Sequence, residues 1–161
     1  MKAEPQKEHH WLQQLVGEWN YEHEAAMAPD KPKEKFTGTE SVSSLGGLWT
    51  IGEGTGPMPD GGTAKTLMTL GYDPQKKRFV GTFVGSMMTQ MWVYEGSLDA
   101  AGKILTLDTE GPNFAPGATG MTKYKDIIEF VSDDYRTLTS RMLGPDGEWH
   151  EFMTAHYRRK R

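Results

Sequence analysis

The segment "EHHWLQQLVGEWNYEHEAAM", residues 8–27, changes its pattern at Gly17. Before this glycine the apolar residues recur at helical spacing, at Trp11, Leu12, Leu15 and Val16. After it, apolar and polar residues alternate with the two-residue period of a strand that is buried on one face. The segment therefore predicts a short amphipathic helix that ends near Gly17 and leads directly into a half-buried strand.

This first strand has an apolar face and an acidic face. The apolar face, which we expect to point inward, consists of Trp19, Tyr21, His23, Ala25 and Met27. The other face carries three glutamates and one asparagine between residues 18 and 24. We expect Trp19 to act mainly as a plug beneath the helix, whereas His23 is either a satisfied core histidine or a polar anchor in a pocket.

The rest of the chain consists of short alternating runs separated by turn residues, such as Asp73-Pro74 and Asp146-Gly147. The expected strands after the first are 35–44, 48–56, 64–73, 78–85, 90–98, 103–111, 121–131, 135–143 and 148–159. No second helical run is long enough for a crossover unit, so the fold class is all-β. Because an open sheet would leave two exposed edges, we predict a closed antiparallel up-and-down β-barrel of about ten strands with a short N-terminal capping helix.

The length of 161 residues fits a single barrel domain over residues 1–161, with 1–7 and 159–161 as frayed tails. A hydrophobic content of 36% argues against disorder. The longest apolar runs are far shorter than the roughly 20 residues that cross a bilayer, and no secretory signal follows the first residues. A cytoplasmic location is therefore the default expectation.

The charge pattern and the absence of cysteine exclude several classes of function. The net charge is −4, and the only basic cluster, Arg158 to Arg161, is interpreted as a solvated chain end rather than a contact for nucleic acid or membrane. Without cysteine there can be no disulfide, thiolate nucleophile or zinc–thiolate site. The adjacent His9 and His10 point about 100° apart on a helix, so they do not form a metal site, and we expect no metal.

Five segments along the chain resemble a known family: "HHWLQQLVGEW", "GTESVSSLGGLW", "TLGYDPQKKRFVGTFVGSM", "YEGSLDAAGKILTL" and "IIEFVSDDYRTLTSRM". Together they resemble the bacterial family called domain of unknown function 1579, from about His10 to Arg158. The helix followed by Gly-x-Trp also resembles the wider lipocalin and fatty-acid-binding superfamily. This resemblance implies a calycin-like β-barrel of about ten strands, and it brings no established activity or catalytic residue.

A more distant resemblance, to the nitrobindin-type haem barrels, rests on the same Gly-x-Trp opening and on a late histidine, here His156. Those barrels coordinate haem through such a histidine. Their opening carries a second glycine where this sequence has Tyr21. We keep haem as a lesser alternative and otherwise expect no cofactor.

Candidate ligand-binding residues follow from the faces of the expected strands. They are Trp19, Tyr21, His23, Glu40, Trp49, Glu53, Tyr72, Met91 and Arg141. Glu40 and Glu53 lie among apolar neighbours of the same face. If inward, each needs a basic partner such as Arg141 or His23, or a raised pKa; the alternative is an outward or strand-end position. Trp49 and Tyr72 are candidate aromatic walls. Met91 belongs to a methionine-rich stretch that either packs in the core or lines a pocket for irregular apolar ligands, and the polar face of Arg141 is either inward or solvent surface.

Three function classes remain open at this point. The first is a barrel that binds a small apolar or amphipathic molecule in its interior. The second is an enzyme of the same fold that uses His23, Glu40, Glu53 and Arg141 for acid–base chemistry. The third is a structural module whose interior is filled by its own side chains. Dimerisation through an outer face of the barrel is compatible with the pattern, although the sequence does not show it.

Overall fold

A computed structural model describes residues 2–26 and 32–161 of the chain. Its elements are α1 (Lys7–Gln13), β1 (Gly17–Ala26), β2 (Lys33–Leu45), β3 (Trp49–Pro57), β4 (Thr63–Asp73), β5 (Arg78–Gly85), β6 (Trp92–Leu98), β7 (Ile104–Pro112), β8 (Met121–Ser132), β9 (Tyr135–Leu143) and β10 (Trp149–Arg159). Met27, which we assigned to the first strand, and residues 28–31 of the following loop lie outside the described residues.

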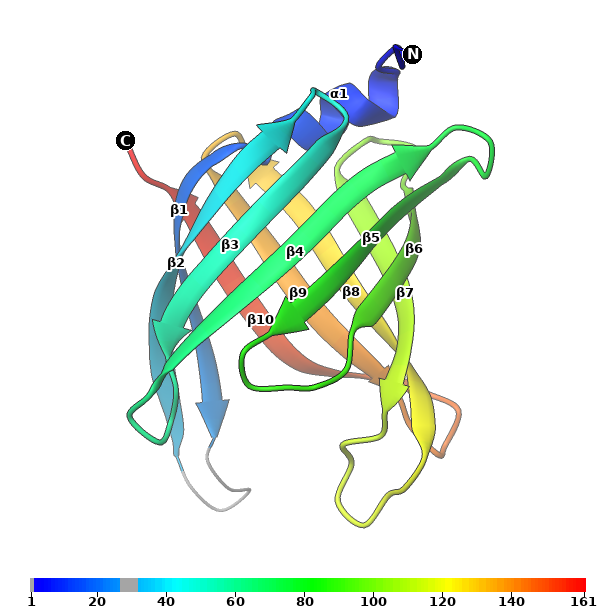
Figure 1. Ribbon diagram of the computed structural model, residues 1–161. Coiled ribbons are helices and arrows are strands. Elements are labelled where there is room, and N and C mark those ends of the chain that lie inside the picture. The colour runs from blue at the N-terminus through cyan, green and yellow to red at the C-terminus, as the bar shows by residue number, and fades with distance from the viewer. Residues whose placement is uncertain (1, 27–31) are drawn as a thin grey trace.

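The ten strands form one closed antiparallel barrel, and the predicted fold class is confirmed. Each strand pairs with its neighbour in sequence, and β1 pairs with β10 to close the ring (Figure 1). This closing seam runs from Trp19 opposite Arg159 to His23 opposite Ala155. Closure leaves no open sheet edge along that seam, which is the physical reason for preferring a barrel to a flat sheet.

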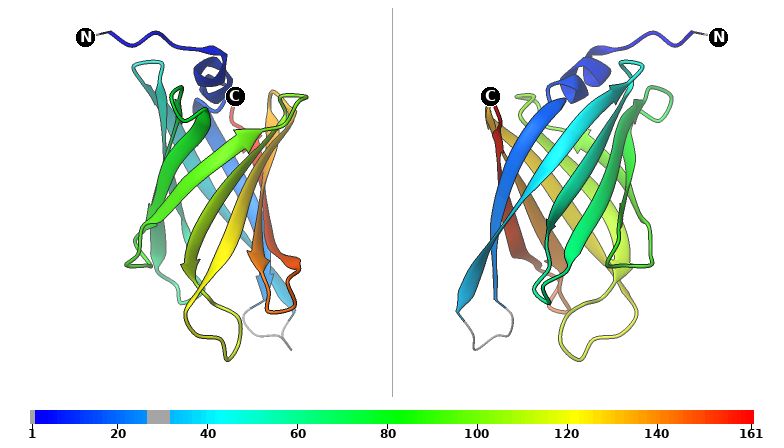
Figure 2. Two further views of the ribbon diagram at one scale, coloured as in Figure 1. Left: turned by 90° about the vertical axis from the view of Figure 1, so that its right-hand side faces the viewer. Right: turned by 60° about the vertical axis from the view of Figure 1, so that its left-hand side comes forward.

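The helix α1 lies across one end of the barrel, and the chain termini lie at the same end (Figure 2). Its Trp11 ring packs edge-on against Phe79 and Phe130, and its indole N–H donates a hydrogen bond of 2.7 Å to the carbonyl of Gly102. Leu12 of α1 and Leu15, just after the helix, are completely or almost completely buried. Within the described residues, no helix is long and apolar enough to span a bilayer.

Gly17 joins the helical segment to β1 as the sequence predicted, and it has a φ of +139°. A side chain there would overlap the guanidinium of Arg159, which donates hydrogen bonds to the carbonyls of Val16 at 2.8 Å and Gln14 at 2.9 Å. The same guanidinium lies 4.2 Å from the Trp19 ring. Arg159, the first residue of the tail that we expected to fray, thus helps to tie the C-terminus to the capped end.

Glycines on the inner surface of the barrel make room for large rings. An added Cβ at Gly38 or Gly56 would overlap the side chain of Tyr21, and one at Gly111 would overlap the ring of Trp92. On β3 the inward positions 52, 54 and 56 are all glycine. The wall formed by β3 is therefore thin, and the side chains of neighbouring strands lie flat against it.

Candidate functional site

The half of the barrel nearest α1 is filled by its own side chains. Its buried residues are Leu12, Leu15, Trp19, Val42, Leu70, Phe79, Leu105, Ile128 and Phe130. The cavity that remains among them has a volume of about 30 Å³, roughly the room for one water molecule. No organic ligand fits in this closed half.

A buried ion pair lies directly below this packed region. The Arg136 guanidinium donates a hydrogen bond of 2.6 Å to the Glu40 carboxylate, and the two side chains are only 4% and 14% exposed. The guanidinium also stacks 4.5 Å from the Trp19 ring and 4.0 Å from the Tyr157 ring. The ion pair and the two rings offset part of the cost of burying both charges, although the buried Arg136 Nε has no hydrogen-bond partner. The pair adds no net charge to the interior.

Tyr21 and Tyr157 continue this polar layer toward the open end, with ring centroids 5.4 Å apart. Burial, followed by the negative charge of Glu40, raises the pKa of both phenols above the usual 10. Both hydroxyls therefore stay protonated at neutral pH and are available as hydrogen-bond donors.

A second carboxylate, that of Asp126 on β8, points into the interior. Its carboxylate accepts a hydrogen bond of 2.5 Å from the Tyr94 hydroxyl and one of 2.7 Å from the Ser140 hydroxyl. Burial raises the pKa of this carboxyl, and the two hydrogen bonds act in the opposite direction. Tyr94 is 1% exposed, whereas Asp126 keeps part of its surface open to the interior.

Aromatic rings surround the open end of the barrel. Tyr124 is buried and packs edge-on against Trp92 at 5.0 Å and against Phe152 at 6.2 Å. Phe114, from the loop between β7 and β8, lies 6.4 Å from the same tyrosine. Yet Phe114 is 66% exposed and Phe152 is 59% exposed. The mouth therefore presents apolar rings that no described residue covers.

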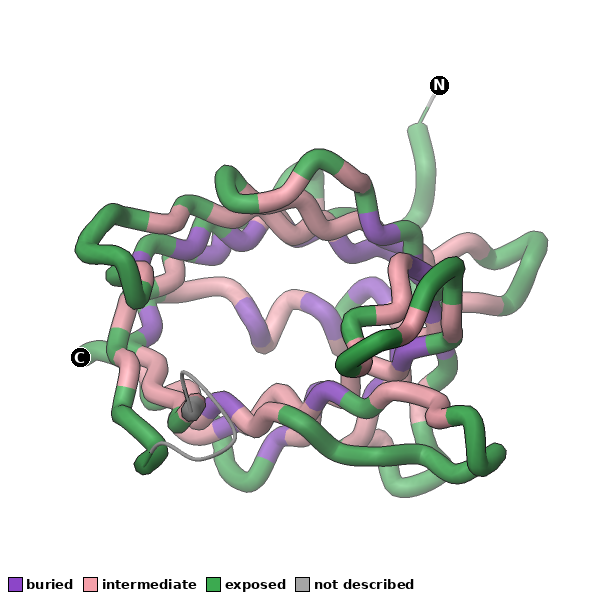
Figure 3. Tube along the Cα trace, turned by 90° about the horizontal axis from the view of Figure 1, so that it is seen from below, coloured by how far each residue is buried: buried purple, intermediate pink, exposed green. Residues whose placement is uncertain are grey.

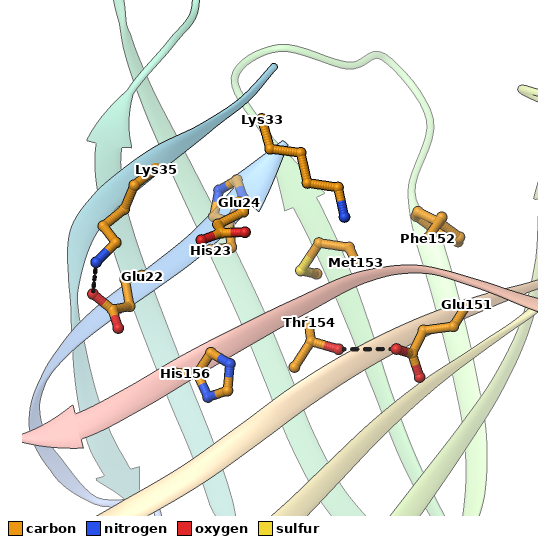
Figure 4. Close-up of a pocket in the computed structure, with 10 residues that line it drawn as sticks. All are labelled: Glu22, His23, Glu24, Lys33, Lys35, Glu151, Phe152, Met153, Thr154 and His156. Atoms are coloured by element: carbon orange, nitrogen blue, oxygen red, sulfur yellow. Dashed lines mark hydrogen bonds and ion pairs between the residues drawn. The ribbon is translucent and has the colours of Figure 1, made fainter. Parts of the chain in front are cut away.

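The open end continues into a gap in the wall between β1 and β10. Their pairing stops at His23, and beyond it the two strands separate (Figure 4). At this point β10 contains an irregularity between Glu151 and Met153. The gap is a cavity of about 420 Å³, lined by Glu22, His23, Glu24, Lys33, Lys35, Glu151, Phe152, Met153, Thr154 and His156. A volume of this size is within the range of small-molecule sites.

Five of the nine predicted ligand-binding residues lie on the inner face of the barrel: Trp19, Tyr21, His23, Glu40 and, at the capped end, Tyr72. Trp19 is fully buried under α1, as expected of a plug, and donates a hydrogen bond of 2.9 Å to the Leu15 carbonyl. Tyr21 and Glu40 belong to the polar layer, and Glu40 has Arg136 as its basic partner rather than Arg141 or His23. His23 lies at the edge of the gap, stacked on Phe36 at 5.5 Å, and burial lowers its pKa.

Three others face away from the interior, which corrects their placement. Trp49 covers Gly71 on the outer surface, and Glu53 and Arg141 are exposed on the outer face of β3 and β9. On β3 the glycines occupy the inner face of the barrel. The other face of this strand, which carries Trp49 and Glu53, therefore points outward. The group of His23, Glu40, Glu53 and Arg141 proposed for acid–base chemistry is therefore not brought together.

Tyr72 and Met91 lie at opposite ends of the molecule. Tyr72 is at the capped end, where its carbonyl bonds to His9 at 3.0 Å and its ring packs against Phe79 at 5.0 Å. Met91 is 59% exposed in the segment before β6, at the open end. Tyr72 thus belongs to the closing layer, whereas Met91 is at the rim of the mouth.

His156, on which the haem alternative rested, points outward. Its neighbours Ala155 and Tyr157 take the inward positions, and its Nδ1 lies 2.6 Å from the Tyr135 hydroxyl. A group bound inside the barrel is out of reach of this histidine.

Five interior residues were not predicted as site residues from the sequence: Arg136, Tyr94, Asp126, Tyr157 and Phe152. A signal for two of them was present. Arg136 alternates with Leu138 and Met142, and Asp126 alternates with Tyr124 and Ile128. Arg136 and Asp126 thus lie among apolar neighbours of the same face, which is the pattern that made Glu40 a candidate.

The sequence matches the family described as "Protein of unknown function (DUF1579)" over residues 4–159. The chain belongs to this family. The match covers nearly the whole sequence and confirms the resemblance that the five segments indicated. No curated protein sequence matches the chain.

Solved structures similar to this DUF1579 chain are barrels. Rv2717c from M. tuberculosis shares 13% of its residues, covers 98% of this chain and 100% of its own, and has a TM-score of 0.60. A redesigned beta barrel has 11% identity, coverage of 92% and 94%, and a TM-score of 0.47. EF1p2_mFAP2b bound to DFHBI has 12% identity, coverage of 94% and 98%, and a TM-score of 0.48. At this identity the likeness to Rv2717c shows the fold alone.

Proposed function

We propose that this DUF1579 protein binds one small amphipathic molecule at the open end of its barrel. The observation that carries the proposal is the exposure of Phe114 and Phe152, whose rings converge on the buried Tyr124 inside the mouth. Burying such rings is favourable by roughly 25 cal/mol for each Å² of apolar surface removed from water. An apolar ligand body would supply that burial.

The polar layer supports an amphipathic rather than a purely apolar ligand. Beyond the aromatic mouth a bound molecule meets the Tyr21, Tyr157 and Asp126 side chains, all of which keep part of their surface exposed within the barrel. A polar group at the far end of the ligand would form hydrogen bonds there, and a hydrocarbon would offer no hydrogen-bond partner to the Tyr21 and Tyr157 hydroxyls. The 420 Å³ gap between β1 and β10 provides a side entrance.

The cellular location and the partners of the protein are proposed from the sequence. We place the protein in the cytoplasm, and we expect neither nucleic acid nor a membrane as its partner. A homodimer formed through an outer face of the barrel is compatible with the site, because both the mouth and the gap would remain accessible.

Native mass spectrometry of protein purified from its own host tests the proposal, with isothermal titration of decanol as a second measurement. We expect a retained small-molecule mass or one-to-one decanol binding, and at least a fivefold weaker decanol affinity in Phe152→Ala. Val93→Ala is the matched control, since Val93 is 61% exposed on the outer face and should leave binding unchanged. A clean mass together with no decanol binding would exclude this function.

A further inference from the structure

The charges inside the barrel are not balanced. Among the described residues, three charged side chains point into the middle of the interior: Glu40, Arg136 and Asp126. Glu40 and Arg136 neutralise each other at 2.6 Å. Asp126 has no basic nitrogen within 4.0 Å among these residues, and its partners are two neutral hydroxyls. One interior carboxylate is therefore left without a counter-charge.

We infer that the ligand carries a protonated amine or a similar cationic head, and that Asp126 is the group that binds it. This inference rests on the proposed function and adds the chemical class of the ligand. A carboxylate that already accepts two hydrogen bonds still has free lone pairs, and charge-assisted hydrogen bonds are about twice as strong as neutral ones. An anionic head would meet an uncompensated negative charge instead.

The surroundings of Asp126 agree with a cationic head. Tyr94 on β6 lies on one side of it, and Tyr157 on β10 lies near enough for the Asp126 charge to raise its pKa. Among the described residues, the only cation in the middle of the interior is Arg136 on β9, which binds Glu40 on β2 and stacks between Trp19 and Tyr157, so it does not compete with a ligand for Asp126.

Three probes with the same ten-carbon chain separate the possibilities: decylamine, decanol and decanoate. We expect decylamine to bind about tenfold more tightly than decanol, and decanoate to bind most weakly. In Asp126→Asn the preference for decylamine should disappear while decanol binding is unchanged. The matched control is Glu53→Gln, which removes one negative charge from the outer face and should preserve the preference.

The pH dependence of the wild-type protein keeps the test decisive if Asp126→Asn does not fold. An alkylamine, like lysine, has a pKa of about 10.4 and stays protonated at lower pH. Any loss of decylamine affinity at acidic pH therefore reflects protonation of the protein and not of the ligand. The groups that face Asp126 are the Tyr94, Tyr157 and Ser140 hydroxyls and, farther away, the Glu40–Arg136 pair. We expect decylamine binding to weaken on acidification as Asp126 takes up a proton, while decanol binding stays constant.

The outcomes distinguish the two proposals. Failure of all three probes to bind the wild-type protein would exclude the binding function itself. Equal or tighter binding of decanol or decanoate, or a preference for decylamine that survives in Asp126→Asn, would leave the binding function standing and overturn the assignment of a cationic ligand.

Discussion

The two halves of this barrel use aromatic residues in opposite ways. At the capped end Trp19 and its neighbours are buried under α1, and the remaining void is about 30 Å³. At the open end Phe114 and Phe152 are more than half exposed although their rings lie against Tyr124. Viewed from the open end, the strands surround the interior, and the loops nearest the viewer are largely exposed (Figure 3). One half stabilises the fold, and the other half carries the proposed site.

The largest effect should come from the buried ring at the capped end. Trp19→Ala removes a fully buried side chain that contacts Phe130, Arg136 and Arg159, so we expect a loss of about 3–5 kcal/mol in the free energy of unfolding. Phe152→Ala at the open end should change it by less than about 0.5 kcal/mol. Urea denaturation of both variants gives these values, and similar losses in the two variants would contradict the division into halves.

The ion pair between the two halves should have the next largest effect. Glu40→Gln leaves the Arg136 charge buried without its partner, which should cost about 3 kcal/mol. Glu53→Gln on the adjacent strand removes the same charge from the outer face and should be nearly neutral. Equal midpoints for these two variants in thermal unfolding would show that the interior pair does not stabilise the barrel.

The thin wall beneath Tyr21 predicts a smaller loss. A Cβ in Gly38→Ala would overlap the Tyr21 ring and the Thr55 carbonyl oxygen, so we expect a cost of about 1–3 kcal/mol. Gly62→Ala, in the loop between β3 and β4, serves as the milder control, because its methyl group would meet only the exposed Asp60 carboxylate oxygen, at 3.2 Å. Urea midpoints that are indistinguishable for the two alanine variants would mean that Tyr21 does not need the close approach.

The smallest effect concerns the protonation of Asp126. Its folded pKa is raised by burial, so between the unfolded and folded pKa values the folded state holds more protons. Stability should therefore fall as pH rises through this window, by at most about 1.4 kcal/mol per pH unit, and Asp126→Asn should lack this component. The difference between wild-type and variant unfolding free energies across pH 4–8 measures it. A constant difference would contradict the raised pKa.

Much of the fold could be predicted from the sequence. The two-residue period from Glu18 onward and the turn residues between runs located all ten strands to within a few residues. The helix, Gly17 and the closure into a barrel were also anticipated. The candidate site was predicted less well. The alternation of apolar and polar residues along a strand indicates which side chains share a face, but it does not show whether that face points inward.

On β3 the absolute direction was decided by the neighbouring strands. The inner positions of β3 are glycines, and the side chains of Tyr21, Glu40 and Thr66 occupy the space that a Cβ would need there. The Trp49 ring packs against Gly71 on the outer surface of the barrel. A hydrophobic pattern read along β3 alone could not contain this information.

The sequence by itself determined the periodicity, the hairpin order and the presence of carboxylates on apolar faces, because these depend on residues close together in the chain. Only the tertiary structure decided that Glu40 meets Arg136, 96 residues away, and that Asp126 has no such partner. It also placed the gap where β1 and β10 separate. These features depend on the register and tilt with which ten strands close a ring, which no local pattern specifies.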